Sequence, residues 1–198
     1  MASAARKLEG MTIAEFDDFI ETLGDEAKLY ELVDGFIVMM SNPTERHEQI
    51  TGNIGARLKL AMDKRGCRSY QGGMRVQRSA ERTAGDKTKP DVVVRCSAPD
   101  SEQEQRTFID DPVVVVEVLS PSTMDYDRGP KLKFYKSLKT LQHIVIVYQD
   151  QRRIEHYRRG KKGWTVDDAL IRPEQVLDLA SVAFTMTVDE AYFGVTIA

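Results

Sequence analysis

Two carboxylates stand where the sequence otherwise predicts buried, apolar strands. Asp91 comes directly before the valine run 92–94, and Glu117 lies inside the run 113–119, which otherwise consists of valine and leucine. An isolated ionised carboxylate is costly to bury, so each of these groups must be paired, protonated or bound to a cation. These two positions are therefore the first candidates for chemistry.

The alternation of side chains along a strand decides which neighbours share a face with each carboxylate. Glu117 shares its face with Val115 and Leu119, and Asp91 shares its face with Val93. If the two strands are neighbours in one sheet, both carboxylates can face one ion. Alternation alone leaves two interpretations open: a divalent-metal site, or a capped strand end together with a structural ion pair to a buried basic residue.

Helices and strands alternate in the rest of the predicted fold. Apolar residues at three- and four-residue steps predict the helices, and Asp34-Gly35 between two apolar runs predicts a β-hairpin. The dense valine runs are typical of central strands covered on both faces. Helices are expected over 12–23, 44–65, 125–138 and 187–192; strands over 29–33, 36–40, 91–94, 113–119, 143–148 and 152–158; a strand pair over 69–77; a hairpin over 160–164; and polar connections over 82–89 and 97–111. The fold class is mixed α/β or α+β, with a central sheet flanked by helices.

Composition is that of a soluble globular domain. The chain has 198 residues, 41% of them hydrophobic and 30% charged, which excludes collagen-like, coiled-coil and disordered classes. We expect one domain over 12–198 after a frayed start over 1–11. No apolar run approaches the roughly 20 residues that a membrane helix needs.

Charge and cysteine content constrain partners and compartment. The formal net charge is −3, so a polyanion must be bound through a local basic patch or a bound cation. Cys67 and Cys96 lack the spacing of a metal site, and two thiols in a chain of this length predict a reducing, cytoplasmic environment rather than a disulfide scaffold.

Ordered stretches over residues 12–192 resemble the Uma2 family, a branch of the PD-(D/E)xK superfamily of restriction-endonuclease-like proteins. The matching stretches are Tyr30-Glu31-Leu32-Val33-Asp34-Gly35, the segment 39–47 with Ser41-Asn42-Pro43 and His47, Pro90-Asp91-Val92-Val93-Val94, Glu117-Val118-Leu119-Ser120-Pro121-Ser122-Thr123, Asp127-Arg128-Gly129 with Lys131 and Tyr135, and the late strand 144–148. The resemblance implies a restriction-endonuclease-like mixed sheet with β-hairpin additions and a divalent-metal phosphodiesterase site.

The metal implied by this resemblance is Mg²⁺ or Mn²⁺. Asp91 and Glu117 supply the oxygen ligands that these ions prefer, and the family pattern suggests the backbone carbonyl of Val118 as a third ligand. A cation held there would polarise a phosphate oxygen, generate a hydroxide nucleophile and stabilise the leaving oxygen.

The third position of the superfamily motif departs from the pattern. A lysine follows the strand glutamate by two residues in the superfamily, but this chain has Leu119 there, which cannot stabilise charge. Lys131 heads an inward stripe with Phe134, Tyr135 and Leu138, and the Uma2 pattern also has a lysine there. We predict that Lys131 supplies the missing amine; the alternative is a structural lysine paired with the strand glutamate.

Four further residues are predicted to support the site. Glu31 is interpreted as a third acidic group, either a metal ligand or a group that orients one, and otherwise as an exposed edge-strand carboxylate. His47 faces inward from the long helix, where it contacts phosphate, holds Glu31, or is a core histidine. Asp127 and Tyr135 lie four residues on either side of Lys131 and are expected to position it, unless Asp127 only caps the helix.

The sequence thus predicts a Mg²⁺- or Mn²⁺-dependent endonuclease that acts on nucleic acid, in this hypothesis DNA. The alternative is a catalytically inactive nuclease-fold module that binds nucleic acid or a protein partner, with Leu119 marking a decayed site. A homodimer is expected by analogy with enzymes that cut both strands. A small-molecule hydrolase is not supported, because the chain has neither a G-x-S-x-G motif nor a Cys–His pair suited to catalysis.

Overall fold

The computed structural model describes residues 10–78, 85–98, 101–120 and 124–197. Most of the start predicted to be frayed, residues 1–11, lies outside these ranges, as do Pro121, Ser122 and Thr123 of the family-like stretch. Within the described residues, no helix is long and apolar enough to cross a membrane.

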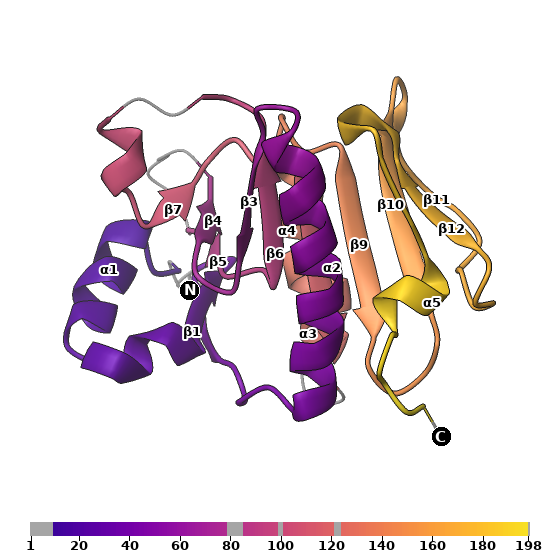
Figure 1. Cartoon of the computed structure of the whole chain (residues 1–198). Helices are drawn as coiled ribbons and strands as arrows, with labels where there is room; N and C mark the ends of the chain where they lie inside the picture. The colour runs from indigo at the N-terminus through magenta and orange to yellow at the C-terminus, as the bar shows by residue number, and fades with distance from the viewer. Residues whose placement is uncertain (1–9, 79–84, 99–100, 121–123, 198) are drawn as a thin grey trace, which may run out of the picture.

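A six-stranded sheet forms the centre of the molecule, in the order β11-β10-β9-β8-β6-β3 (Figure 1). Its strands are β3 (Arg68–Gln71), β6 (Val92–Arg95), β8 (Val114–Leu119), β9 (His143–Tyr148), β10 (Ile154–Gly160) and β11 (Gly163–Val166). Strands β8 and β9 run parallel, and the other neighbours are antiparallel. Every residue of β6, β8 and β9 is buried, as expected of central strands covered on both faces.

Shorter strands form a second sheet, in the order β2-β1-β5-β4-β7. The last two strands, β12 and β13, form a separate hairpin. These strands are β1 (Tyr30–Val33), β2 (Phe36–Met39), β4 (Arg75–Gln77), β5 (Lys87–Thr88), β7 (Phe108–Ile109), β12 (Val176–Leu179) and β13 (Phe184–Thr187). The predicted hairpin at Asp34-Gly35 is confirmed, because β1 and β2 pair across it.

The strand pair predicted over 69–77 is wrong. Strands β3 and β4 belong to different sheets, because the chain turns away at Gly72, whose φ of +65° is accessible to glycine without strain. The described parts of the two polar connections contain β5 and β7. Strands of two residues are too short to show alternation, which explains why the pattern missed them.

Helices cover both faces of the central sheet. The helical segments of the described residues are α1 (Ile13–Glu21), α2 (Glu45–Asp63), α3 (Met124–Tyr126), the π-helical segment η3 (Asp127–Lys131), α4 (Leu132–Ser137) and α5 (Val188–Ala191), with short 3₁₀ turns η1 (Gly24–Leu29), η2 (Gln103–Gln105) and η4 (Ala180–Val182). The predicted capping box of Thr12 and Glu15 is present. The helix expected over 125–138 contains the π-helical segment at Pro130, which has no N–H to donate.

Two apolar clusters attach these helices to the sheet. The stripe of α2, with Ile50, Ile54 and Leu58, packs with Val116 and Val118 on one face. The other face packs against α4 through the cluster that contains Val115, Leu119, Leu132, Phe134 and Tyr135. In Figure 1, α2 crosses in front of the sheet and α4 lies behind it. Val116 and Val118 face α2, so alternation along β8 directs the side chain of Glu117 toward α4.

The expectation of free thiols is wrong, because Cys67 and Cys96 form a disulfide. Strands β3 and β6 pair with Arg68 opposite Arg95, and the same register sets the two cysteines opposite each other at the next position. Their Cα atoms are 4.1 Å apart. The spacing of 29 residues along the chain carried no signal of this pairing, because only the strand register creates it.

Reduction of the disulfide should lower the free energy of unfolding by about 2–4 kcal/mol. The bond closes a loop between residues 29 apart and so restricts the unfolded chain. Urea unfolding with and without a thiol reductant measures the effect. A Cys67→Ser/Cys96→Ser variant is the control and should not respond to the reductant. Equal midpoints for oxidised and reduced wild type would contradict the prediction.

Candidate active site

The two carboxylates predicted to share a site do lie side by side. Strands β6 and β8 pair with Val92 opposite Val116 and Val93 opposite Val115, and this register continues to Asp91 and Glu117. Both line one cavity of about 260 Å³. That cavity is also lined by other predicted residues: Glu31, His47, Val118, Asp127 and Lys131.

Asp91, directly before the first residue of β6, is held by two contacts. Its Oδ2 accepts the backbone N–H of Val118 at 2.7 Å and lies 3.3 Å from Nε2 of His47. Burial lowers the pKa of His47, but the hydrogen bond and charge of Asp91 outweigh this and raise it above its ordinary value. His47 therefore contacts Asp91, and the predicted contact with Glu31 is not among the contacts described. The predicted contact with phosphate stays a prediction.

Lys131 is surrounded by carboxylates. Its Nζ lies 3.0 Å from Oε1 of Glu117, 3.2 Å from Oε1 of Glu31 and 3.5 Å from Oδ1 of Asp127, and the side chain is 1% exposed. Burial alone would lower the pKa of Lys131, but the charges of Glu117 and Glu31 raise it well above its ordinary value. The ammonium is thus charged and links three acids in one cluster. Asp127 lies within the helical stretch rather than at its start, so the cap interpretation is wrong.

Glu117 is fixed by a second partner on α4. The hydroxyl of Tyr135 donates to its Oε1 at 2.5 Å, and Thr88 of β5 donates to the Tyr135 oxygen at 2.9 Å. Burial raises the pKa of Glu117 well above its ordinary value, and the charge of Lys131 opposes this rise. Tyr135 was predicted to position Lys131, but its hydrogen bond goes to Glu117 instead.

Glu31 belongs to this cluster and not to an exposed edge. It is buried on β1, which lies between β2 and β5 in its sheet. Its carboxylate accepts the backbone N–H of Lys89 at 2.7 Å and the hydroxyl of Tyr126 at 3.1 Å, besides its contact with Lys131. The interpretation as an exposed edge-strand carboxylate is therefore wrong.

Three residues of the site are not among the predicted site residues: Lys89, Thr88 and Tyr126. Lys89 lines the cavity half-buried, and its Nζ donates to the backbone oxygen of Lys28 at 3.2 Å. Burial lowers the pKa of Lys89, and the nearby charge of Arg75 lowers it further. The adjacency of Lys89 to Pro90-Asp91 was the one available signal, whereas Thr88 and Tyr126 had none.

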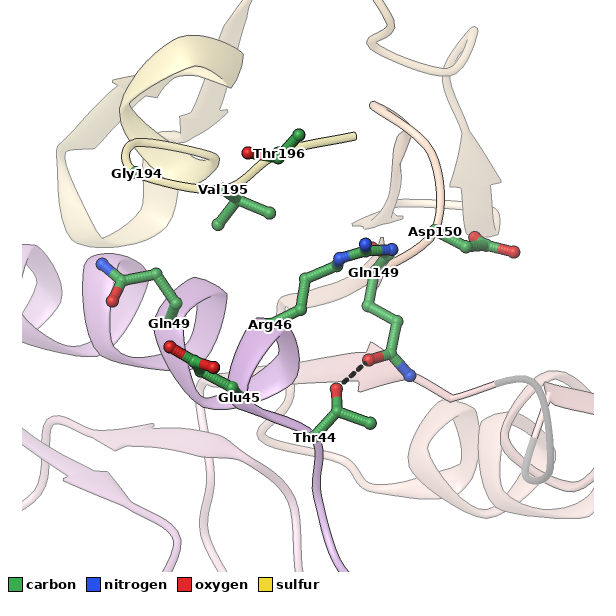
Figure 2. A pocket seen from close by; sticks show the side chains of 9 residues that line it. All are labelled: Thr44, Glu45, Arg46, Gln49, Gln149, Asp150, Gly194, Val195 and Thr196. Carbon is green, nitrogen blue, oxygen red and sulfur yellow. Dashed lines mark hydrogen bonds between the residues drawn. The ribbon is translucent and has the colours of Figure 1, made fainter. Parts of the chain in front are cut away.

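A larger cavity of about 600 Å³ lies at the start of α2 (Figure 2). It is lined by Thr44, Glu45, Arg46, Gln49, Gln149, Asp150, Gly194, Val195 and Thr196. Its charges are mixed, and the acidic cluster lines the smaller cavity instead. Thr44 connects the two sites, because it donates to Gln149 Oε1 at 2.5 Å and accepts the backbone N–H of His47 at 3.2 Å.

The donor set fits one class of metal and excludes another. Among the residues described, no three or more histidine, cysteine, aspartate or glutamate side chains are arranged to hold a metal ion. A closed structural zinc site of four ligands is thus excluded for these residues. Mg²⁺ is usually held by one or two carboxylates and takes its remaining ligands from water and substrate phosphates. Asp91 and Glu117, opposite each other in one cavity, fit this second type.

The mixed sheet flanked by helices, with the acidic cluster at the ends of β6 and β8, defines a restriction-endonuclease-like nuclease fold. A protein from Anabaena variabilis, titled a "putative nuclease belonging to DUF820", has this fold with a TM-score of 0.70, 18% identity, and coverage of 89% of this chain and 96% of that one. The family model of Uma2, described as "Putative restriction endonuclease", matches residues 14–189. The chain belongs to the Uma2 family.

Two relatives from Synechocystis sp. (strain ATCC 27184 / PCC 6803 / Kazusa) are similar in sequence. One is 29% identical over 181 residues, which is 90% of each chain. The other is 25% identical over 141 residues, which is 71% of this chain and 78% of the relative. Both are named as uncharacterized proteins, so the similarity supports the family and leaves the reaction to be argued from the site.

Proposed function

We propose that the protein is a Mg²⁺- or Mn²⁺-dependent endonuclease that hydrolyses phosphodiester bonds in DNA. One observation carries the proposal: Asp91 and Glu117 lie opposite each other on paired strands, in one cavity, with the Lys131 ammonium 3.0 Å from Glu117. Two carboxylates can hold a divalent cation, and an ammonium beside them can stabilise the negative charge that develops on a phosphate during hydrolysis. A homodimer would allow both strands of a duplex to be cut.

In this proposal, Asp91, Glu117 and the backbone carbonyl of Val118 hold the divalent cation. When bound, the cation supplies Lewis-acid stabilisation of phosphate charge and lowers the pKa of bound water. The Val118 N–H and His47 orient Asp91, while the Tyr135 hydroxyl orients Glu117. These hydrogen bonds hold the carboxylates in place before a substrate arrives.

Lys131 supplies the amine that Leu119 cannot. It reaches the carboxylates from η3 rather than from β8, and stabilises negative charge at the back of the cavity. Glu31 and Asp127 hold its ammonium on two further sides. We assign Glu31 to this positioning role and not to the metal, because its contacts go to Lys131, Lys89 and Tyr126.

One observation favours the alternative of an inactive nuclease-fold module. The Lys131 ammonium is 1% exposed and already contacts three carboxylates, so it is well placed to stabilise the fold without touching a substrate. A module of this kind would keep the family fold and bind nucleic acid or a protein partner. Catalysis separates the two hypotheses.

Cleavage of supercoiled plasmid DNA with millimolar Mn²⁺ tests the proposal. Wild type should nick or linearise the plasmid, and Asp91→Ala should not exceed the rate without enzyme. Asp63→Ala is the matched control, because Asp63 is exposed at the far end of α2 and pairs only with the nearby Lys59 in the contacts described. Equal cleavage by wild type and Asp91→Ala would reject the site, and no cleavage by wild type would favour the inactive module.

A further inference from the structure

Outside the acidic cluster, Glu155 of β10 is a second buried carboxylate with cationic partners. It is 4% exposed. Its oxygens accept from Nη2 of Arg128 at 3.3 and 3.4 Å and from Nη2 of Arg153 at 2.8 Å. The hydroxyls of Tyr148 and Tyr157 donate to it at 2.9 and 3.2 Å. Two arginines from different elements thus converge on one carboxylate.

The strand register relates this carboxylate to the candidate active site. Glu117 of β8 is opposite Ile146 of β9, and Ile146 is opposite Glu155 of β10. Paired residues project from the same face of a sheet, so Glu117 and Glu155 lie in one row on the same face. Neighbouring strands are about 4.8 Å apart, which separates the two residues by about 10 Å at the backbone.

The segment η3 connects the two carboxylates directly. Arg128 contacts Glu155, and three residues later Lys131 contacts Glu117. Asp127, between Tyr126 and Arg128, lines the candidate active-site cavity. Arg128 therefore lies on the same short segment as the proposed catalytic amine, and Glu155 holds the end of that segment nearer to β10.

The charge and exposure of the two arginines indicate a site that is open to an anionic ligand, and not an ion pair closed off from solvent. Burial raises the pKa of Glu155, but hydrogen bonds from Arg153 and Tyr148 outweigh it and lower the pKa below its ordinary value. One ionised carboxylate thus faces two cations, which leaves a net charge of about +1. The side chains of Arg128 and Arg153 are 44% and 37% exposed, so guanidinium edges are accessible beside the acidic cavity.

We propose that Arg128 and Arg153, held together by Glu155, form a phosphate-binding subsite for the nucleic-acid backbone beside the active site. The inference rests on the proposed nuclease function and adds to it where the substrate lies. A guanidinium fork matches the geometry of a phosphodiester. A separation of about 10 Å corresponds to about three nucleotide rises of 3.4 Å along the axis of a duplex. The subsite therefore contacts a phosphate a few nucleotides from the cleaved bond and reads no base sequence.

Binding without cleavage tests this subsite. Fluorescence anisotropy with a labelled DNA duplex of about 20 base pairs, in EDTA, measures affinity across a series of salt concentrations. We expect Arg128→Ala/Arg153→Ala to weaken binding about 10- to 100-fold near 0.1 M salt and to reduce the slope of log K against log salt by about 1–2. Arg128→Lys/Arg153→Lys keeps both charges and should recover most of the slope.

Arg152→Ala is the matched control on the same loop. Arg152 pairs with Asp189 of α5, away from Glu155, and its loss should leave the salt slope within error of wild type. Thermal unfolding of each variant verifies that it is folded. A double alanine variant that folds and binds like wild type would overturn the subsite, as would a wild type that binds no duplex. The binding test and the plasmid test fail independently. If the subsite were overturned, plasmid cleavage that depends on Asp91 would still support the nuclease. If wild type did not cleave but the arginine variants changed the salt dependence of binding as expected, only the nuclease function would be rejected.

Discussion

Replacing Lys131 with methionine should destabilise the protein by about 3–5 kcal/mol at neutral pH. The substitution keeps an unbranched side chain of similar length but removes the ammonium that contacts Glu117, Glu31 and Asp127. A buried charge left without its partner is more costly than the pair was favourable, because desolvation is no longer offset. The proposed catalytic amine is also lost, so cleavage should fall with stability.

The pH dependence of this loss follows from the pKa directions. Burial raises the pKa of Glu117 above its ordinary value, and without Lys131 nothing in that contact opposes the rise. A carboxylate with a raised pKa in the folded state contributes stability below its ordinary pKa, and this is lost as pH rises through the raised value. The loss in free energy of unfolding caused by Lys131→Met should therefore shrink as the pH is lowered toward about 4.5.

Lys131 itself follows the same rule in the wild type, but over a much higher pH range. Its folded pKa is raised, so its contribution is fully present below the ordinary lysine pKa and is lost only as pH rises through the raised value. At neutral pH the wild type therefore keeps the whole contribution. The difference between wild type and Lys131→Met should be largest from neutral to mildly alkaline pH.

Urea unfolding at neutral and acidic pH measures these differences. Lys133→Met is the matched control: Lys133 is exposed on the solvent side of α4, and its loss should change the free energy of unfolding by less than about 0.5 kcal/mol. If Lys131→Met were as stable as wild type at neutral pH, the ammonium would not be what holds the acidic cluster together.

Periodicity and turn chemistry made the local elements predictable. The stripe of α2, the capping box at Thr12 and the Asp34-Gly35 hairpin are all local signals, and all three are present. The juxtaposition of Asp91 and Glu117 was predictable for a related reason. Strands rich in valine on both faces belong at the centre of a sheet, and alternation then decides which face each carboxylate shares.

Contacts that depend on the register of distant strands were not predictable. The pairing of Cys67 with Cys96 and the row that joins Glu117 to Glu155 both arise only when particular strands align. A side chain such as Tyr126 gave no warning in the sequence, because its role is to donate to Glu31, which lies 95 positions earlier in the chain. The family resemblance predicted which residues form the site, whereas the hydrogen-bond partners of those residues are decided by tertiary packing.

Mn²⁺ should stabilise the folded protein through the same two carboxylates. A ligand that binds only the folded state adds about 2.7 kcal/mol at a concentration of about 100 times its Kd. For a chain of this size, that corresponds to a rise in Tm of about 5–11 °C. The gain is expected because Asp91 and Glu117 face one cavity, and a divalent cation would relieve the repulsion between them and Glu31.

Isosteric variants assign this stabilisation to the proposed ligands. Asp91→Asn and Glu117→Gln should each lose most of the Mn²⁺-dependent rise in Tm. Glu48→Gln should keep it, because Glu48 lines the same cavity but is exposed on α2 beside His47. The increment with metal is compared within each variant, so a change in intrinsic stability does not affect the result. An equal increment in Asp91→Asn would locate the ion elsewhere.

The metal titration also separates the two functional hypotheses before any substrate is chosen. A centre built from Asp91 and Glu117 responds to Mn²⁺ whether the preferred substrate is DNA or another nucleic acid, since the ligands belong to the protein. In an inactive module, Lys131 would neutralise Glu117 and His47 would pair with Asp91, so an added cation would gain little free energy by binding. A wild type that does not respond to Mn²⁺ would therefore favour the inactive module, with Leu119 as the mark of its loss of activity.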